Sequence, residues 1–248
     1  MKKKTKRKKQ PKQKKNDPFF KSKQFNGSLN SRMQNAARKS GRSPDDITLV
    51  AVTKSFPQNI WDIALMHNLT TLAESRIQEA KEKLRTFKHR DKIELHLIGR
   101  LQSNKARKAG EMFDVIQTVD SIKLAKRLNA ISAEANKSQK IYLQVNIGKD
   151  PNKQGFTPDE IIDSAKEVSA LENLELNGIM TIPPQGIPTN NLRELYKKTR
   201  EIRNVIKESI NRVCKNLSMG MSNDFEIAIE EGATHIRIGT ALFGARPQ

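Results

Sequence analysis

The sequence is poor in cysteine and contains no long apolar stretch. Cys214 is the only cysteine among 248 residues, which excludes an internal disulfide and a cysteine-based zinc site and favours a reducing compartment. No run of eighteen apolar residues occurs, so we expect no membrane-spanning helix. The basic N-terminus lacks the apolar stretch that a secretory signal requires. These absences predict a soluble, cytoplasmic protein.

Acidic residues are also scarce. The chain has 46 Lys and Arg against 27 Asp and Glu, a formal net charge of +19. Residues 1–15 hold ten basic residues and no acidic one, which leaves an ordinary basic bias for the rest of the chain. Because like charges repel and Pro11 and Pro18 interrupt any helix, residues 1–26 are predicted to form a disordered lysine-rich arm.

Two interpretations of the lysine-rich arm stay open. Its residues 1–23 would contact nucleic acid or another anionic surface nonspecifically and in a salt-dependent way, or they only keep the protein soluble. Residues 1–18 contain no aromatic side chain that could stack on a base, so sequence-specific RNA recognition is not indicated.

Residues 27–248 alternate short apolar segments with helical patterns. The apolar segments are 47–53, 69–73, 93–98, 115–119, 141–147, 174–180, 216–218 and 235–238. The helical patterns are 28–40, 58–67, 76–87, 104–110, 122–136, 158–171, 191–213 and 224–231, with a last one after residue 241. Eight strands, each followed by a helix, predict an α/β protein with one (β/α)8 TIM barrel. A doubly wound open sheet is the alternative, although no Gly-x-Gly-x-x-Gly follows the first strand.

Function in such a barrel lies at the carboxyl ends of the strands. Lys54 ends the first strand, where partial desolvation favours an unprotonated amine that attacks an aldehyde. Ser222 is interpreted as the N-cap of a helix, whose free amides suit a phosphate. Gly239 and Thr240 follow the last strand, where phosphate sites recur in this fold. A Schiff-base lysine beside a phosphate site predicts binding of pyridoxal 5′-phosphate. Taken singly, Lys54 could be a lysine that extends from a strand end into solvent, and Ser222 could be a serine that only caps a helix.

Eight segments carry a resemblance to a known family. They are 49–57 (LVAVTKSFP), 96–105 (HLIGRLQSNK), 118–120, 143–146, 155–156, 178–184 (GIMTIPP), 217–226 (LSMGMSNDFE) and 237–246 (RIGTALFGAR). The chain resembles the pyridoxal phosphate homeostasis proteins, which share a fold with the N-terminal barrel of bacterial alanine racemases. The lysine-rich arm lies outside the resemblance.

The resemblance implies roles for seven residues. Lys54 would form the Schiff base, Arg237 would face the pyridine nitrogen, and Met219 would lie close to the ring. The phosphate would be bound by Ser222, Gly239 and Thr240. Ser75 completes the cofactor-binding set, at a position where the family usually has an asparagine. Arg100 likewise replaces a common histidine, so fine contacts around the ring are expected to differ.

The predicted function is to bind pyridoxal phosphate reversibly and to buffer or deliver it. The expected partners are this cofactor, other B6 vitamers and apo-enzymes, and the expected state is a monomer. Alanine racemases take a tyrosine base from a C-terminal β domain, which we expect to be absent because the sequence ends at Gln248. Tyr142 lies in a strand and Tyr196 in a helix, so neither is expected at the barrel mouth. We therefore expect no catalytic residue, no metal and no efficient catalysis.

Two alternative functions stay open. One is a pyridoxal-phosphate-dependent amino-acid racemase, and the other is a nucleic-acid-binding protein that works through the lysine-rich arm.

Two smaller expectations concern the barrel itself. His96 is expected to point into the barrel without a metal, and Ser121 is expected to cap the helix that follows it.

Overall fold

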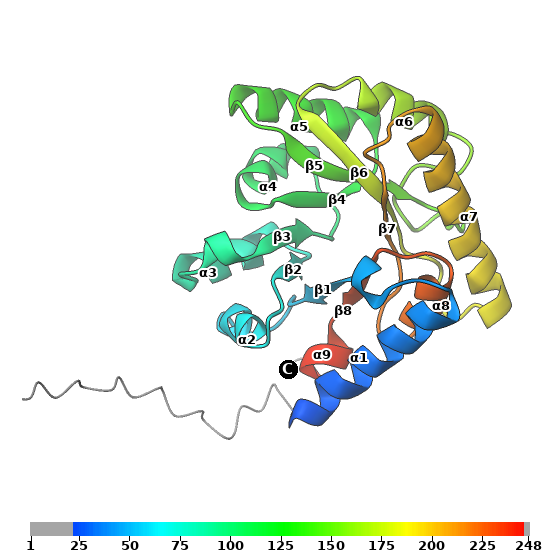
Figure 1. The fold of residues 1–248 in the computed structure, drawn as a ribbon. Coiled ribbons are helices and arrows are strands. Elements are labelled where there is room, and N and C mark those ends of the chain that lie inside the picture. Colours follow the sequence, from blue (N-terminus) through cyan, green and yellow to red (C-terminus); the bar gives the residue numbers. More distant parts are fainter. Residues whose placement is uncertain (1–21, 246–248) are drawn as a thin grey trace, which may run out of the picture.

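Eight parallel strands close into a barrel with helices around it (Figure 1). The computed structural model describes the backbone of residues 22–245 and the side chains from residue 27 onward. The strands are β1 (Thr48–Val52), β2 (Thr71–Glu74), β3 (Glu94–Leu97), β4 (Val115–Val119), β5 (Gln139–Val145), β6 (Leu174–Thr181), β7 (Asn216–Ser218) and β8 (His235–Ile238). Each strand pairs with the next, and β8 pairs with β1, where Thr48 lies opposite His235. The predicted (β/α)8 barrel is confirmed, and the open sheet is wrong.

The helices follow the strands in the predicted order. They are α1 (Ser22–Lys39), α2 (Ile60–Met66), α3 (Ile77–Thr86), α4 (Ala106–Met112), α5 (Ile122–Glu134), α6 (Ile161–Ser169), α7 (Thr189–Ser209), α8 (Phe225–Glu230) and α9 (Thr240–Phe243). Three single 3-10 turns add η1 (Pro44–Asp46), η2 (Arg90–Lys92) and η3 (Ser103–Lys105). The side chain of Ser121 accepts the Leu124 N–H and caps α5 as expected. In the described part of the chain no helix has the length and apolarity to cross a membrane.

The strands are apolar because most of them are covered on both faces, as parallel strands in barrels are. All five residues of β4 are buried. The largest group of buried residues includes many strand and helix side chains, such as Leu72, Ile116 and Phe225. Two smaller clusters, formed around Val52 and around Met180, are separate from it.

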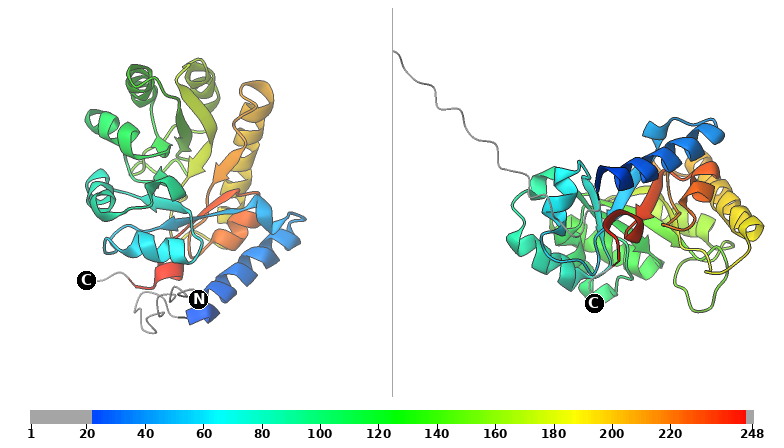
Figure 2. Two further views of the ribbon diagram at one scale, coloured as in Figure 1. Left: turned by 60° about the vertical axis from the view of Figure 1, so that its left-hand side comes forward. Right: turned by 90° about the horizontal axis from the view of Figure 1, so that it is seen from below.

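Helix α1 precedes the barrel and packs against α8 and α9 (Figure 2). Its buried residues Leu29, Met33, Ala36 and Ala37 recur at helical spacing, which makes one apolar stripe. The helix ends just before Gly41, whose φ of +69° suits a glycine.

The start of α1 differs from the expectation. The helix is already formed at Ser22, the first residue whose backbone the structure describes and six residues before the expected start near residue 28, and no proline after Pro18 prevents this. One internal glycine costs only about 1 kcal/mol in a helix. For residues 1–21, the predicted lysine-rich arm lies outside the residues that the structure describes.

Candidate functional site

A cavity of about 630 Å³ opens at the carboxyl ends of the barrel strands, within the size range of small-molecule sites. Five of the seven predicted cofactor-binding residues line it: Lys54, Ser222, Arg237, Gly239 and Thr240. They follow β1 and β7 or belong to the end of β8, so the closure of the barrel brings distant segments together. The loop between β6 and α7 forms a further wall with residues 182–187.

Lys54 lies two residues beyond β1 and is half-buried. The backbone turns sharply after it, since Ser55 has a φ of +64°. The residues on both sides of Lys54 are held by side chains from α3. Lys83 Nζ donates to the Thr53 carbonyl over 2.7 Å, and the Ser55 N–H donates to Glu79 Oε1 over 2.5 Å. The Lys54 backbone is therefore fixed from outside the cavity.

A buried ion pair supports this loop. Lys83 Nζ lies 2.6 Å from Glu74 Oε1 and 2.9 Å from Glu79 Oε1, and Lys83 is only 1% exposed. Glu74 Oε1 also accepts the Thr53 hydroxyl over 2.6 Å. Burial raises the pKa of Glu74 above its ordinary value, although Lys83 acts in the opposite direction. We name Glu74, Glu79 and Lys83 the loop clamp.

Sequence reasoning did not identify the loop clamp. The available signal is the position of Lys83 in the apolar stripe of α3, between the buried residues Ala80 and Phe87. A lysine at a buried position of a helix requires a carboxylate partner, because an unpaired buried charge is too costly.

Arg237 is buried at the floor of the cavity, with 4% of its surface exposed. Its Nη1 donates to Ser218 Oγ and its Nη2 to the Thr181 carbonyl, both over 2.8 Å. Burial lowers the pKa of the guanidinium, but arginine stays charged in proteins. The orientation of this cation is thus determined by β6 and β7.

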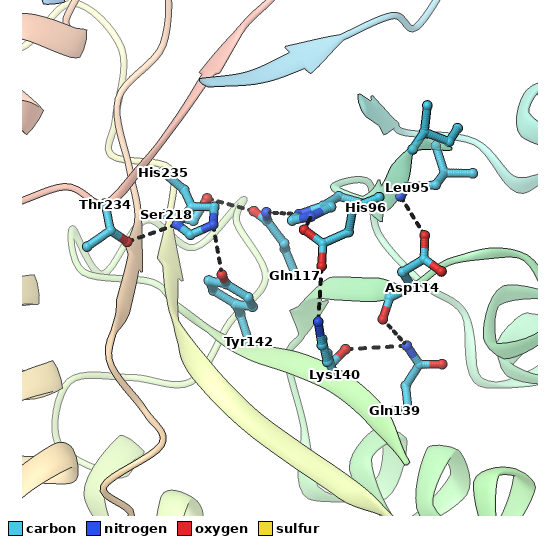
Figure 3. A network of polar contacts seen from close by, with 12 residues as sticks. Leu95, His96, Asp114, Gln117, Gln139, Lys140, Tyr142, Ser218, Thr234 and His235 are labelled. Atoms are coloured by element: carbon cyan, nitrogen blue, oxygen red, sulfur yellow. Dashed lines mark hydrogen bonds and ion pairs between the residues drawn. The ribbon is translucent and has the colours of Figure 1, made fainter. Parts of the chain in front are cut away.

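A chain of hydrogen bonds continues from Arg237 through Ser218 across the interior of the barrel, and Figure 3 shows it from Ser218 through Gln117 to His96. Ser218 Oγ donates to Gln117 Oε1 over 2.6 Å, and Gln117 Nε2 donates to His96 Nδ1 over 2.7 Å. His96 Nε2 donates to Glu94 Oε2 over 3.0 Å. We name Arg237, Ser218, Gln117, His96 and Glu94 the interior chain. The tautomer of His96 is assigned from this pattern of donors and acceptors.

The interior chain ends at a carboxylate at the amino end of β3. Lys140 Nζ also donates to Glu94, over 3.2 Å to Oε1. The hydrogen bond from His96 lowers the pKa of Glu94 to about 2, and Lys140 lowers it in the same direction. His96 is 1% exposed, so its predicted orientation into the barrel is confirmed. In the described residues, no group of three His, Cys, Asp or Glu could hold a metal ion.

The loops after β7 and β8 meet at the other end of the cavity. Ser222 Oγ accepts the Ala241 N–H over 3.4 Å, which joins the β7 loop to the first turn of α9. Gly220 lets the β7 loop pack closely against α8, because a Cβ at this residue would lie 2.5 Å from Ala228 Cβ. Ser222 and Thr240 both line this end of the cavity.

The predicted capping role of Ser222 is wrong. Helix α8 begins at Phe225, and the residue before it is Asp224. The segment 221–225 first makes a turn, in which Asp224 Oδ1 accepts the Met221 N–H over 2.5 Å. Because this turn delays the helix, the hydroxyl of Ser222 is available to α9 instead.

Ser75 and Met219 do not line the cavity. Ser75 lies in a separate cavity with Arg76 and Arg100, and Met219 is fully buried in the core. Met221, two residues further along the chain, lines the cavity that contains Lys54. Contact of Ser75 or Met219 with a cofactor stays a prediction.

Neither of the two tyrosines lines this cavity, although the charges of Asp224 and Arg237, which do line it, act on the pKa of Tyr196. Tyr142 lies inside the barrel, with its hydroxyl 3.4 Å from His235 Nε2 (Figure 3). Tyr196 is fully buried on α7. Burial raises the pKa of both phenols. The titratable residues that line the cavity in the described part of the chain are Lys54, Asp224 and Arg237.

Comparison with known sequences identifies similar proteins over most of the chain. Residues 28–247 match the family described as "Alanine racemase, N-terminal domain". A pyridoxal phosphate homeostasis protein of Synechocystis sp. is 39% identical over 203 residues, which are 82% of this chain and 93% of that protein. The protein of the same name from Escherichia coli K12 is 36% identical over 215 residues, 85% of this chain and 91% of that protein.

Solved structures show the same fold. PipY of Synechococcus elongatus PCC7942, determined without pyridoxal phosphate, has a TM-score of 0.81 and 36% identity and covers 89% of this chain and 99% of its own. A structure of PipY with pyridoxal phosphate bound has a TM-score of 0.76 and 34% identity and covers 86% of this chain and 100% of its own. Alanine racemase of Clostridium difficile 630 is 16% identical, with a TM-score of 0.67 over 89% of this chain and 61% of its own, and shares the fold alone.

Proposed function

This chain belongs to the family of the alanine racemase N-terminal domain and, within it, to the pyridoxal phosphate homeostasis proteins, and on that basis we propose that it binds pyridoxal 5′-phosphate and maintains the cellular supply of this cofactor. The observation that carries the proposal is the shared cavity of Lys54, Arg237, Ser222, Gly239 and Thr240. These residues offer an amine, a fixed cation and a group of hydroxyls and amides.

The residues of the cavity match the functional groups of the cofactor. When bound, pyridoxal phosphate supplies an aldehyde and an electron-withdrawing pyridine ring. Lys54 Nζ is the group that holds the aldehyde carbon as a Schiff base, with loss of water. The hydroxyls of Ser222 and Thr240, with the backbone amides beside Gly239, bind the phosphate.

Arg237 favours binding over catalysis. Its guanidinium is a permanent cation whose direction is fixed by Ser218 and by the Thr181 carbonyl. A cation beside the pyridine nitrogen keeps this nitrogen unprotonated, which weakens the ring as an electron sink. The site therefore holds the cofactor without strongly activating it.

The protein works without efficient catalysis in this proposal. Proton exchange at an amino-acid α-carbon needs an acid and a base on opposite faces of the substrate. Lys54 can serve as one of them. Asp224 is engaged by the Met221 N–H, and neither tyrosine lines the cavity.

We extend the proposal to partners and assembly. The protein acts in the cytoplasm as a monomer and exchanges pyridoxal phosphate and other B6 vitamers with apo-enzymes. In the described part of the chain the exposed large apolar side chains are Met66, Val205 and Val213. They are too few for the apolar centre of a stable dimer interface.

The test is the visible absorption of the purified protein after addition of pyridoxal phosphate. We expect a Schiff-base band in the wild type that borohydride removes, and we expect no band in Lys54→Ala. Lys81→Ala, which replaces an exposed lysine of α3, is the matched control and should keep the band. A band of equal strength in Lys54→Ala would refute the role of Lys54, and its absence from the wild type would refute the proposed function.

A further inference from the structure

A second cavity, of about 480 Å³, lies beside the loops after β2 and β3 and is lined by cations. Arg76, Arg100, Lys105 and Lys108 surround it, together with the side chains of Gln78 and Gln102. All four cations are exposed, and no acidic residue lines the cavity. Because it shares no lining residue with the cavity that contains Lys54, it is a separate feature of the barrel mouth.

A third cavity, of about 520 Å³, continues the same surface. It is lined by Lys123, Lys126 and Arg127 of α5, with Ser103 and Asn104. The 3-10 turn η3 contributes residues to both cavities, so the two adjoin at this turn. We name the six cations Arg76, Arg100, Lys105, Lys108, Lys123 and Arg127 the basic face. Lys126 is left out because it pairs with Glu167 over 2.6 Å.

The charge of the basic face is not balanced by neighbouring carboxylates. Within residues 27–245, none of the six cations makes an ion pair, whereas Arg107 on the same helix as Lys108 pairs with Glu134. Glu79 of α3 is already engaged by Lys83. Asp120 is partly buried, and its charge interacts with that of Arg100.

The excess of positive charge on the basic face does not stabilise the fold. The first turn of α5 contains Lys123 and no acidic residue, although the helix dipole disfavours a cation there. Lys123 and Arg127 are also four residues apart on one side of the helix, where like charges repel. The residues of the basic face therefore cost free energy that a bound polyanion would recover.

We propose that the basic face binds the phosphodiester backbone of nucleic acid without reading its sequence. The six cations are spread over neighbouring elements: Arg76 precedes α3, Arg100 and Lys105 lie between β3 and α4, Lys108 lies on α4, and Lys123 and Arg127 lie on α5. Helix α4 contacts both α3 and α5 (Figure 1). Six cations are more than one small phosphate needs and suit a chain of phosphates. No aromatic residue lines either cavity, so bases have no platform on which to stack.

The shape of the surface favours nucleic acid over an anionic membrane. Both groups of cations line recesses between helices, and a flexible phosphate chain can enter a recess. A flat lipid surface contacts protruding residues instead. Since the basic face and the cavity that contains Lys54 are separate, nucleic acid and pyridoxal phosphate bind independently.

The test compares two triple variants of the full-length chain. The first is Lys105→Gln/Lys108→Gln/Lys123→Gln on the basic face. The matched control is Lys197→Gln/Lys198→Gln/Lys207→Gln on α7, where all three lysines are exposed. Both variants lose three charges and keep the lysine-rich arm, so any difference between them reports on the basic face.

Binding is measured by fluorescence anisotropy with a labelled oligouridylate of about 20 nucleotides and with the corresponding oligothymidylate, over a salt series. We expect the basic-face variant to bind both probes about tenfold more weakly at 0.1 M salt, and the control about twofold or less. Each lost phosphate contact lowers the slope of log K against log salt by about 0.7, so the slope should fall by about 2 in the basic-face variant alone.

Three outcomes would overturn the proposal. The wild type does not bind either probe, or both variants lose equal affinity, which would make total charge the cause. The third is loss of binding to phosphatidylserine vesicles in the basic-face variant with RNA binding unchanged, which would assign the face to lipid. The Schiff-base band with pyridoxal phosphate and the thermal unfolding curve report separately whether each variant is folded.

Discussion

Arg237 is a charge enclosed in the barrel with no carboxylate in contact, in the described part of the chain. Such a group is costly unless each of its donors finds an acceptor. The interior chain supplies this compensation, because Ser218, Gln117 and His96 connect the guanidinium to Glu94 through successive hydrogen bonds. The position of one residue that lines the cavity thus depends on side chains at the opposite end of the barrel.

Replacement of Gln117 tests this dependence. Gln117→Leu removes the acceptor of the Ser218 hydroxyl and the donor to His96 Nδ1, so two buried polar atoms lose a partner and we expect a loss of about 2–5 kcal/mol in unfolding free energy. We also expect weaker binding of pyridoxal phosphate, because Arg237 loses its fixed direction. Urea unfolding and titration of the absorption band measure the two effects.

The control for this experiment is Gln144→Leu on β5. The side chain of Gln144 makes an exposed hydrogen bond to the Gln154 carbonyl, so its loss should cost about 1 kcal/mol or less. Equal losses in the two variants, or an unchanged affinity for pyridoxal phosphate in Gln117→Leu, would show that the interior chain does not position Arg237.

His235 makes the stability depend on pH. Burial lowers its pKa to about 3, with further lowering by His96 and Arg237 and an opposing effect of Glu94. The unfolded chain takes up a proton on this histidine below about pH 6.5, whereas the folded protein does not. Stability should therefore fall as the pH falls from 6.5, by up to about 1.4 kcal/mol per pH unit.

This prediction is checked by thermal unfolding of the wild type and His235→Gln between pH 7 and pH 5. The pKa of Glu94 is about 2, so the stability it contributes is lost only as the pH falls below about 4.5 and does not interfere in this range. The pH slope should be smaller in the variant. His89→Gln, on an exposed residue, should keep the slope of the wild type, and an unaltered slope in His235→Gln would contradict the assignment.

Among the elements, α3 has a function beyond covering the barrel. Through the loop clamp it holds Thr53 and Ser55, the residues on either side of Lys54. The interactions also extend to α2, since Trp61 Nε1 donates to Thr53 Oγ1 over 2.9 Å. Two helices outside the barrel therefore hold the loop that carries the lysine.

Lys83→Met tests the loop clamp. The substitution keeps a long side chain but leaves the buried Glu74 without its cation, so we expect a loss of about 3–5 kcal/mol in unfolding free energy. The double variant Glu74→Gln/Lys83→Met should recover part of this loss, because the fully buried residue 74 then carries no charge and only the partly exposed Glu79 has lost its cation. Urea unfolding measures the unfolding free energy of both variants. A double variant as unstable as the single one would contradict this explanation.

The elements show how much of the fold the sequence predicts. The bounds of β4, β7 and β8 agree with the expectation to the residue, because polar or turn residues flank short apolar segments there. The predictions for the start of α1 and for the capping role of Ser222 were wrong. Gly27 does not end α1, because one glycine disfavours a helix only weakly. The turn between Met221 and Asp224 moves the start of α8 away from Ser222. The loop clamp and the interior chain depend on contacts between distant segments, which no local pattern contains.

The candidate site shows the same division. Lys54, Ser222, Gly239 and Thr240 were predictable, because the end of a strand in a closed barrel determines which side chains share a cavity. The roles of Arg237, Met219 and Ser75 were assigned by resemblance, and of these three only Arg237 lines the cavity that contains Lys54. In the structure the loop after β2 packs closely against Gly99, where a Cβ would come within 2.0 Å of the Ser75 carbonyl oxygen. Ser75 lines the separate cavity that also contains Arg76 and Arg100.

At the scale of the whole molecule, the arrangement of titratable groups bears on the proposal of a cofactor carrier rather than an enzyme. The described barrel places Lys54, Asp224 and Arg237 around one cavity, which neither tyrosine lines. With one available base, two-sided proton exchange lacks a partner for Lys54. The racemase alternative predicts the opposite behaviour.

This difference is measured by exchange of the α-proton of several amino acids in deuterated water. We expect the loaded protein to exchange far below the ordinary range of enzyme turnover, about 1–10³ per second. A racemase of the same fold serves as the positive control. Exchange within the ordinary range would establish an enzyme and refute the proposed absence of efficient catalysis.

The interior chain also restricts which residues can replace one another. All of its hydrogen bonds point the same way, from Arg237 toward Glu94, so position 117 must present an acceptor to Ser218 and a donor to His96. Among natural side chains of suitable length, only a glutamine or a neutral histidine offers both. Any other residue at this position requires a simultaneous change at position 96 or 218. These positions should therefore covary as a unit among related sequences.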